Sequence, residues 1–233
     1  MSQIAEHLLQ VKERIVQAAS RAGRSGDHIQ LLAVSKTKPL EAVCEAYAAG
    51  QRRFGESYAQ EAATKIDTLR EQGTCTDIEW HFIGPLQSNK SKLVAERFDW
   101  VQSVDREKLI ERLNNQRPTG LAPLNICLQI NISGESSKSG TSEQEIFRLA
   151  ELVSRCERLR LRGLMAIPEH TSDEAVLAAQ MARMQTLFTE LARQYPGVDT
   201  LSMGMTEDLE LAIGHGSTMV RVGTAIFGAR DYS

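Results

Sequence analysis

The chain is 233 residues long, which is enough for one sizeable hydrophobic core, and no change in composition divides it into parts. Its formal net charge of −3 argues against a surface that binds nucleic acid or an anionic membrane. No stretch approaches the roughly 18 consecutive apolar residues of a transmembrane helix, and the N-terminus lacks the residue order of a signal peptide. We therefore expect a cytoplasmic protein with a single domain, residues 1–233, that binds neither membranes nor nucleic acid.

Cysteine and histidine residues are too dispersed to predict a metal site. They are Cys44, Cys75, Cys127 and Cys156, together with His7, His28, His81, His170 and His215. No CxxC or HExxH motif links any of them, and such motifs mark structural and catalytic zinc sites. We therefore expect reduced thiols, as is usual in the cytosol, and no bound metal.

The first predicted element is an N-terminal helix. Leu8, Val11 and Ile15 belong to an apolar series with three- and four-residue spacing, which is typical of a helix with one buried face. Ser2 has a side chain that can cap the first turn, and Gly23 can end the helix in a left-handed conformation.

Eight short apolar runs follow this helix, and each is short enough to form a buried strand. They span residues 29–34, 53–55, 79–83, 100–104, 124–131, 159–165, 200–202 and 219–222. Amphipathic helix patterns separate the runs, and two of these patterns begin with capping-box sequences at Ser142 and Thr171. Strands that alternate with helices in this way are parallel and are joined by right-handed crossovers. An open doubly wound sheet and a closed barrel both fit, and the count of eight favours the barrel.

The sequence therefore predicts an α/β fold, a single (β/α)8 TIM barrel with an extra N-terminal helix. In such barrels, functional residues gather where the strands end at the C-terminal face. The first strand ends at Lys36, directly before a loop that contains Pro39. Burial at a strand end lowers the pKa of a lysine, and the neutral amine can attack an aldehyde. A solvated loop lysine is the ordinary alternative at this position.

The loops after the last two strands predict a phosphate site. They are rich in glycine and hydroxyl residues, and each precedes a short helix. The residues concerned are Ser202, Gly204, Gly223 and Thr224. Backbone amides near helix N-termini bind phosphate, and these two loops often do so in barrels. Together with Lys36 they predict a phosphorylated aldehyde as the ligand, although glycine and threonine after a strand also form ordinary turns and helix caps.

Several segments of the chain resemble one known family. They are AVSKTKP (33–39), FGE (54–56), WHFIGPLQSNK (80–90), QIN (129–131), GLMAI (163–167), LSMGM (201–205) and GSTMVRVGTAIFG (216–228). These segments are similar to the signatures of the pyridoxal phosphate homeostasis protein family, which is related to the N-terminal domain of alanine racemases. The resemblance covers essentially the whole chain, and residues 80–90 are its most specific part.

The resemblance implies a barrel of PLP fold type III that holds pyridoxal 5′-phosphate (PLP). At the matching positions, it implies that Lys36 forms a Schiff base with the cofactor and that Arg221 faces the pyridine nitrogen. The residues that it assigns to the phosphate are Ser202, Gly204, Gly223 and Thr224. One position departs from the family pattern, because Ser57 stands where asparagine commonly follows the FGE segment. A hydroxyl has a shorter reach than an amide, so the family's contact at this position is not carried over.

Five further residues are weaker candidates for the same site. Asn131 and Met165 are expected to line the pocket of the cofactor ring, and packing in the core is the alternative. His81 is expected to stack near the cofactor or to hydrogen-bond a strand end. Lys38 and Lys138 are candidate secondary amines that react with PLP, and solvated loop lysines are the alternative.

The resemblance favours binding of PLP over catalysis. A guanidinium such as that of Arg221 can only donate a hydrogen bond to the pyridine nitrogen, so it weakens the cofactor as an electron sink. Racemisation also needs a second base, which in alanine racemases is a tyrosine of a C-terminal domain that we do not expect after Ser233. We therefore predict a non-enzymatic, monomeric protein of intracellular PLP homeostasis without catalytic residues. Its expected partners are PLP and the apo-enzymes that receive it.

Two enzymatic functions remain as alternatives. The first is a PLP-dependent amino-acid racemase that uses Tyr58 or His81 as the second base. The second, more distant alternative is a Schiff-base aldolase that acts on a phosphosugar through Lys36.

Overall fold

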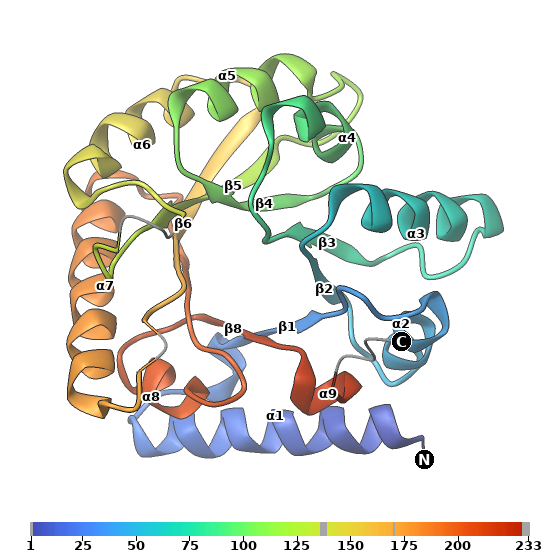
Figure 1. Ribbon diagram of the computed structural model, residues 1–233, viewed down its shortest axis with the longest axis horizontal. Helices are drawn as coiled ribbons and strands as arrows, with labels where there is room; N and C mark the ends of the chain where they lie inside the picture. The colour runs from blue at the N-terminus through green and yellow to red at the C-terminus, as the bar shows by residue number, and fades with distance from the viewer. Residues whose placement is uncertain (1, 136–138, 170, 230–233) are drawn as a thin grey trace.

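The eight apolar runs form a closed barrel in the computed structural model, which describes residues 2–135, 139–169 and 171–229 (Figure 1). The strands are β1 (Gln30–Val34), β2 (Arg53–Glu56), β3 (Glu79–Phe82), β4 (Trp100–Val104), β5 (Leu124–Ile130), β6 (Leu159–Ala166), β7 (Thr200–Ser202) and β8 (Met219–Val222). Each strand pairs in parallel with the next in sequence, and β8 pairs with β1. The predicted α/β barrel is confirmed.

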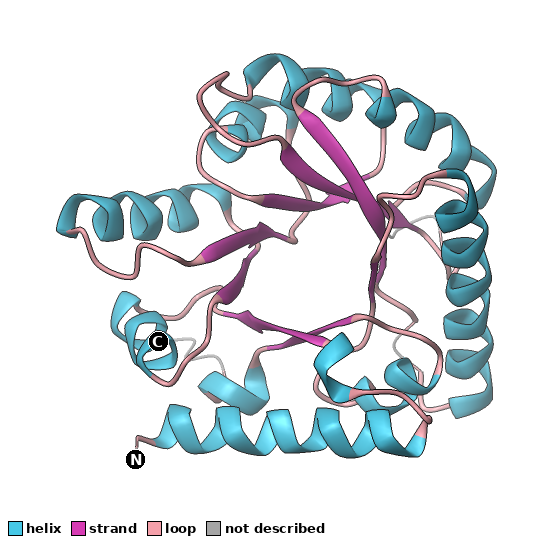
Figure 2. Cartoon of the chain, turned by 180° about the vertical axis from the view of Figure 1, so that it is seen from behind, coloured by secondary structure: helices cyan, strands magenta, loops and turns pink. Residues whose placement is uncertain are grey.

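Helices surround the barrel and connect its strands (Figure 2). They are α1 (Gln3–Arg21), α2 (Leu40–Ala48), α3 (Ala59–Gln72), α4 (Ser91–Ala95), α5 (Glu107–Gln116), α6 (Ile146–Ser154), α7 (Glu174–Gln194), α8 (Leu209–Gly214) and α9 (Thr224–Phe227). The described residues also form three 3₁₀ turns: η1 (Gly26–His28), η2 (Ser88–Lys90) and η3 (Glu143–Glu145). The strand ends that carry the predicted site therefore meet inside a ring of helices.

The extra N-terminal helix forms as predicted. The Ser2 hydroxyl accepts a hydrogen bond from the Ala5 amide at 3.3 Å, and Gly23 has a left-handed φ of 66° just after the helix. The buried face, which includes Leu8 and Val11, packs against α8 and α9. Helix α1 thereby covers the part of the barrel where β8 meets β1 (Figure 1).

The predicted capping boxes are wrong in detail. Asp173, and not Thr171, is the N-cap of α7, and its carboxylate accepts hydrogen bonds from the amides of Ala175 and Val176 at 2.9 and 3.3 Å. A carboxylate is favoured there because it is charged and lies at the positive end of the helix dipole. Ser142 precedes the 3₁₀ turn η3, and its side chain makes no capping hydrogen bond.

The interior of the barrel holds both apolar and polar side chains. A large apolar cluster fills the space between strands and helices, and a separate small cluster consists of Trp100, Cys127 and Met165. Polar side chains that are buried in the same strands include Gln102 and Ser202. Buried polar groups need hydrogen-bond partners, so the interior of the barrel is organised by specific contacts.

The described ranges contain neither a membrane-spanning helix nor a cluster of metal-binding side chains. None of their helices combines the length and the hydropathy that crossing a bilayer requires. The same ranges contain no group of three or more histidine, cysteine, aspartate or glutamate side chains that could hold a metal ion. The four cysteines are free thiols.

Candidate functional site

Lys36 lies at the C-terminal mouth of the barrel. It follows the end of β1 by two residues and is partly buried. The turn that contains it is closed by a hydrogen bond from the Lys38 amide to the Ser35 carbonyl oxygen at 3.1 Å. Thr37, the next residue, has a left-handed φ of 63°, which is strained for a β-branched side chain. A tight, strained turn therefore carries the lysine at the strand end.

The loop after β8 lies beside the strand that carries Lys36. Strands β8 and β1 pair in parallel, so their C-terminal ends are adjacent. A Cβ atom at Gly223 would lie 3.2 Å from the Val34 carbonyl oxygen, so glycine allows the loop to approach β1 closely. Thr224 begins α9 and is exposed. The structure thus brings Gly223 and Thr224 to the same mouth as Lys36.

The loop after β7 reaches the same region. Gly204 is buried, with a φ of 95°, and its carbonyl oxygen accepts a hydrogen bond from the Arg221 amide at 2.9 Å. A Cβ atom at Gly204 would lie 2.5 Å from the Ala212 Cβ, so a side chain does not fit there. The first amides of a helix have no acceptor within it and bind anions well. With α8 and α9 beginning next to these loops, the residues at the mouth fit a phosphate group.

Arg221 ties the ends of three strands together. Its guanidinium donates hydrogen bonds to the Ser202 carbonyl oxygen, the Ser202 hydroxyl and the Ala166 carbonyl oxygen, each at 2.8 Å. The residue is 4% exposed, and burial lowers the pKa of Arg221 to about 10. The guanidinium therefore remains charged at neutral pH and is held in one position beneath the mouth.

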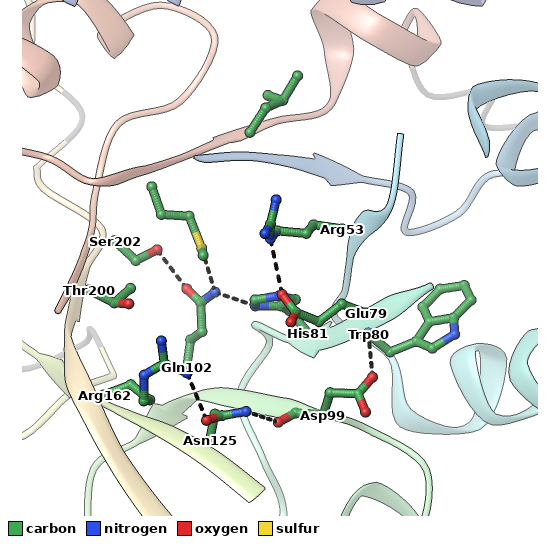
Figure 3. A network of polar contacts seen from close by, with 12 residues as sticks. Arg53, Glu79, Trp80, His81, Asp99, Gln102, Asn125, Arg162, Thr200 and Ser202 are labelled. Atoms are coloured by element: carbon green, nitrogen blue, oxygen red, sulfur yellow. Dashed lines mark hydrogen bonds and ion pairs between the residues drawn. The ribbon is translucent and has the colours of Figure 1, made fainter. Parts of the chain in front are cut away.

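A series of hydrogen bonds continues from Ser202, the partner of Arg221, through the barrel interior, and Figure 3 shows it from Ser202 to Glu79. The Ser202 hydroxyl accepts from Arg221 and donates to Gln102 Oε1 at 2.6 Å. The Gln102 amide nitrogen donates to His81 Nδ1 at 2.9 Å, and His81 Nε2 lies 3.0 Å from Glu79 Oε1. This series of hydrogen bonds links the mouth to Glu79, the first residue of β3. Within it, the Ser202 hydroxyl donates its proton to Gln102, toward the interior of the barrel.

These contacts determine the protonation state of His81. An amide nitrogen can only donate, so Nδ1 is the acceptor and Nε2 carries the proton that is donated to Glu79. Burial lowers the pKa of His81, which favours the same neutral ring. The ring stacks on Trp100 with 4.9 Å between centroids. Of the two expectations for His81, the structure shows the hydrogen-bonded one. Both ring nitrogens are engaged within the protein, so neither is left to bind a ligand.

Met165 and Asn131 lie in different environments. Met165 is fully buried with Trp100 and Cys127, one residue before the end of β6. Asn131 directly follows β5 at the mouth, and its side-chain amide donates to the Glu135 carbonyl oxygen at 2.8 Å. The structure thus brings Asn131 to a strand end, whereas Met165 belongs to the interior cluster.

A buried ionic network behind Lys36 was not predicted. Lys65 Nζ donates to the Ser35 carbonyl oxygen at 3.0 Å, to Glu56 Oε1 at 2.9 Å and to Glu61 Oε1 at 2.7 Å. The Ser35 hydroxyl also donates to Glu56 Oε1 at 2.7 Å. The network therefore joins α3 and β2 to the residue that immediately precedes Lys36.

The place of Lys65 in the sequence could have indicated this network. Lys65 lies within the buried stripe of α3, between Ala62 and Ile66, and a lysine there requires a charged or polar partner. Glu56 ends β2 with 0% exposure. Burial raises the pKa of Glu56, and the Lys65 cation opposes that rise. Two residues of opposite charge at buried positions, here Lys65 and Glu56, indicate an ion pair.

Tyr58 and Lys38 lie on the rim of the mouth. Tyr58 is 51% exposed, directly before α3. Lys38 Nζ donates to the Ala229 carbonyl oxygen at 2.6 Å, which ties the loop after β1 to the segment that follows α9. Lys138, the other candidate secondary amine, lies outside the described residues.

Proteins of known sequence resemble this chain over its whole length. The family described as "Alanine racemase, N-terminal domain" matches residues 7–231. A pyridoxal phosphate homeostasis protein from Escherichia coli (strain K12) is 58% identical over 234 residues, which cover 100% of this chain and 99% of the relative. One from Pseudomonas aeruginosa is 56% identical over 232 residues, which cover 100% of this chain and 98% of the relative.

Solved structures share the barrel. PipY of Synechococcus elongatus PCC7942 with PLP bound has a TM-score of 0.82 and 36% identity, over 97% of this chain and 100% of PipY. Alanine racemase from Corynebacterium glutamicum has a TM-score of 0.68 over 99% of this chain and 62% of the racemase, and its 17% identity supports the fold alone. Because relatives of this identity match it over its whole length, the chain belongs to the pyridoxal phosphate homeostasis protein family, which has the fold of the alanine racemase N-terminal domain.

Proposed function

We propose that the protein binds PLP, holds it as a Schiff base on Lys36 and thereby takes part in PLP homeostasis. The name of its relatives and the PLP-bound structure of PipY support the choice of cofactor. The observation that carries the assignment is the position of Lys36 at the end of β1, beside the glycine loop that follows β8. An amine and a phosphate site at one mouth suit an aldehyde that bears a phosphate.

The residues of the mouth have distinct roles in this proposal. The Lys36 amine attacks the PLP aldehyde, and the Schiff base forms with loss of water. The residues at the phosphate end are Gly204, Gly223 and Thr224, with Ser202 beside them at the end of β7. Arg221 faces the pyridine nitrogen, and Asn131 lies at the edge of the ring. Because the Ser202 hydroxyl binds Arg221 and Gln102, it also holds the guanidinium in place.

The surroundings of the mouth favour binding over turnover. The Arg221 guanidinium can only donate a hydrogen bond, so it opposes protonation of the pyridine nitrogen and weakens the electron sink that racemisation needs. Of the two candidate second bases, Tyr58 is 51% exposed on the rim and His81 has both ring nitrogens engaged. A binding protein therefore fits these contacts better than a racemase.

Absorption spectroscopy with chemical mapping tests the Schiff base. PLP added to the protein should produce a visible absorption band, and borohydride reduction followed by peptide mapping should find the pyridoxyl group on Lys36. Lys36→Ala should weaken the band. Lys38→Ala is the control, because it removes a neighbouring amine that is bound to the Ala229 carbonyl oxygen. A pyridoxyl group on another lysine of the unmodified chain would refute the assignment.

A PLP-dependent amino-acid racemase is the second candidate, because the fold is shared with alanine racemase. Incubation of the PLP-loaded protein with L-alanine in deuterated water distinguishes the two functions. We expect no incorporation of deuterium at the α-carbon at a catalytic rate. Deuteration at such a rate, with formation of D-alanine, would establish the racemase instead.

Delivery of the cofactor completes the proposal. We propose that the protein acts as a monomer in the cytoplasm and passes PLP to apo-enzymes. Transfer should activate an apo-enzyme even when a scavenger removes free PLP from solution. Transfer that stops when the scavenger is present would limit the protein to storage and buffering of PLP.

A further inference from the structure

Helix α3 holds both peptide groups that flank Lys36. The Ser35 carbonyl oxygen, in the peptide group before Lys36, accepts a hydrogen bond from Lys65 Nζ at 3.0 Å. The Thr37 amide, in the peptide group after Lys36, donates to Glu61 Oε1 at 2.7 Å. Because peptide groups are planar, holding both of them fixes the direction in which the Lys36 side chain leaves the backbone.

Glu61 and Lys65 act as one unit. They lie one helical turn apart and form an ion pair at 2.7 Å. Lys65 also pairs with Glu56 at 2.9 Å, so its three N–H donors are used by Ser35, Glu56 and Glu61. The side chains of Lys65 and Glu56 are 8% and 0% exposed. Charge-assisted hydrogen bonds that are shielded from water in this way hold their geometry firmly.

Thr37 is the part of the turn that requires this support. Its φ of 63° is unfavourable for a β-branched residue, and such a conformation persists only where neighbouring contacts maintain it. The hydrogen bond to Glu61 acts on the amide of this same residue. Without that bond the turn would relax to an unstrained conformation, and the Lys36 side chain would point elsewhere.

We propose that Glu61 and Lys65 are positioning residues for Lys36, which keep its turn in the strained conformation that presents the amine to PLP. This inference rests on the proposed function, because it requires Lys36 to be the reacting amine. An amine that is oriented before PLP arrives does not have to be ordered during binding, so capture of PLP is faster and tighter.

Substitutions of Glu61 test the positioning role. Lys65→Met would leave the buried Glu56 without its cation, whereas the Glu61 side chain is 31% exposed and is the better site for a substitution. Glu61→Ala removes the acceptor of the Thr37 amide, and Glu61→Gln keeps an oxygen that can accept it. Glu61→Ala should slow the capture of PLP about tenfold to a hundredfold, in line with the strain that it releases, and Glu61→Gln should remain close to the unmodified protein.

Glu96→Ala is the matched control. Glu96 also forms an i,i+4 pair with a lysine, Lys92, and its side chain is 34% exposed. Capture of PLP should be unchanged in this variant. Equal slowing in Glu61→Ala and Glu96→Ala, or in Glu61→Ala and Glu61→Gln, would overturn the positioning role.

Thr37→Gly provides a rescue at the strained residue itself. Glycine adopts a positive φ without strain, so the double variant Glu61→Ala/Thr37→Gly should recover most of the lost capture rate. Because glycine also removes the strain of the positive φ from the folded state, urea unfolding of both variants must show that the recovery of the capture rate does not merely follow a rise in the free energy of unfolding. Capture that stays as slow as in Glu61→Ala would count against the inference.

Hydrogen exchange of the PLP-free protein separates this inference from the proposed function. Glu61→Ala should accelerate exchange of the Thr37 amide, and Glu61→Gln should preserve its protection. A pyridoxyl group on a lysine other than Lys36 would refute the proposed function, and the positioning role with it. A pyridoxyl group on Lys36, with unchanged exchange and capture in Glu61→Ala, would refute the positioning role alone.

Discussion

Ser202 holds two buried polar groups through one hydroxyl. It accepts a hydrogen bond from Arg221 and donates one to Gln102, and all three residues are almost completely buried. A buried polar group that loses its partner costs about 1–3 kcal/mol. Ser202→Ala should therefore lower the free energy of unfolding, measured in urea, by about 1–3 kcal/mol.

Ser103 provides the matched control for this prediction. Its hydroxyl is buried in the neighbouring part of β4 and has no hydrogen-bond partner among the described residues. Ser103→Ala should leave the free energy of unfolding unchanged or raise it, because it removes a polar atom that is not compensated. Equal losses in the two variants would show that the Ser202 hydroxyl has no special role.

His81 should make the stability of the fold depend on pH. Burial lowers the pKa of His81 in the folded protein below its ordinary value of 6.5. As the pH falls, the unfolded chain therefore binds a proton first, so the contribution to stability is full above that value and declines below it. His81→Asn should reduce the decline in the free energy of unfolding between about pH 7.5 and pH 5, measured in urea.

A control variant and the pKa of Glu79 make the pH prediction specific to His81. His28→Asn, on an exposed residue, should keep the pH dependence of the unmodified protein. Burial raises the pKa of Glu79, but the hydrogen bond with His81 and the Arg53 charge outweigh it and lower the pKa to about 2. Glu79 therefore titrates below this pH range. An unchanged pH dependence in His81→Asn would contradict the prediction.

At the scale of secondary-structure elements, a backbone contact sets the spacing of the loops after β2 and β3. A Cβ atom at Gly84 would lie 2.2 Å from the Ser57 carbonyl oxygen, so these loops meet with no room for a side chain. The contact at position 57 is thus made by backbone atoms of Ser57. It does not depend on the side chain, which departs from the family pattern. Gly84→Ala should lower the free energy of unfolding by about 1–3 kcal/mol, through overpacking.

Gly120→Ala is the control for this substitution. A Cβ atom at Gly120 would meet no heavy atom of the described residues within 4 Å, and Gly120 does not require a positive φ. Alanine there restricts the unfolded chain, so stability should be unchanged or slightly higher. Thermal unfolding of the two variants gives the comparison, and equal midpoints would refute the steric argument.

At the scale of the whole molecule, a ligand at the mouth would join loops that are far apart in the sequence. The loops after β1, β7 and β8 meet there. A ligand that binds only the folded state stabilises it, by about 2.7 kcal/mol when its free concentration is 100 times its Kd. PLP should therefore raise the urea concentration at the midpoint of unfolding. At the same PLP concentration, this rise should be smaller in Lys36→Ala. Equal gains would show that Lys36 does not contribute to binding.

The strands and the site differ in how much of them could be predicted. Each strand begins and ends within one residue of an apolar run, because a short buried strand is a local pattern of hydrophobic residues. Lys36, Gly223 and Thr224 were predicted at the mouth because parallel strands end on one face of a barrel. The capping residue of α7 was missed, since Thr171 and Asp173 both match a capping sequence and only the path of the chain selects Asp173.

The sequence by itself determined the barrel, the family and the lysine at the end of β1, because periodicity and motifs are properties of neighbouring residues. Only the tertiary structure decided what surrounds that lysine. Gln102 and Ser202 are 100 positions apart, and Lys65 reaches the Ser35 carbonyl oxygen from 30 positions away. Polar residues such as these carry no period that indicates their partners. Their contacts arise because the closed barrel and its helices bury them together, where each donor requires an acceptor.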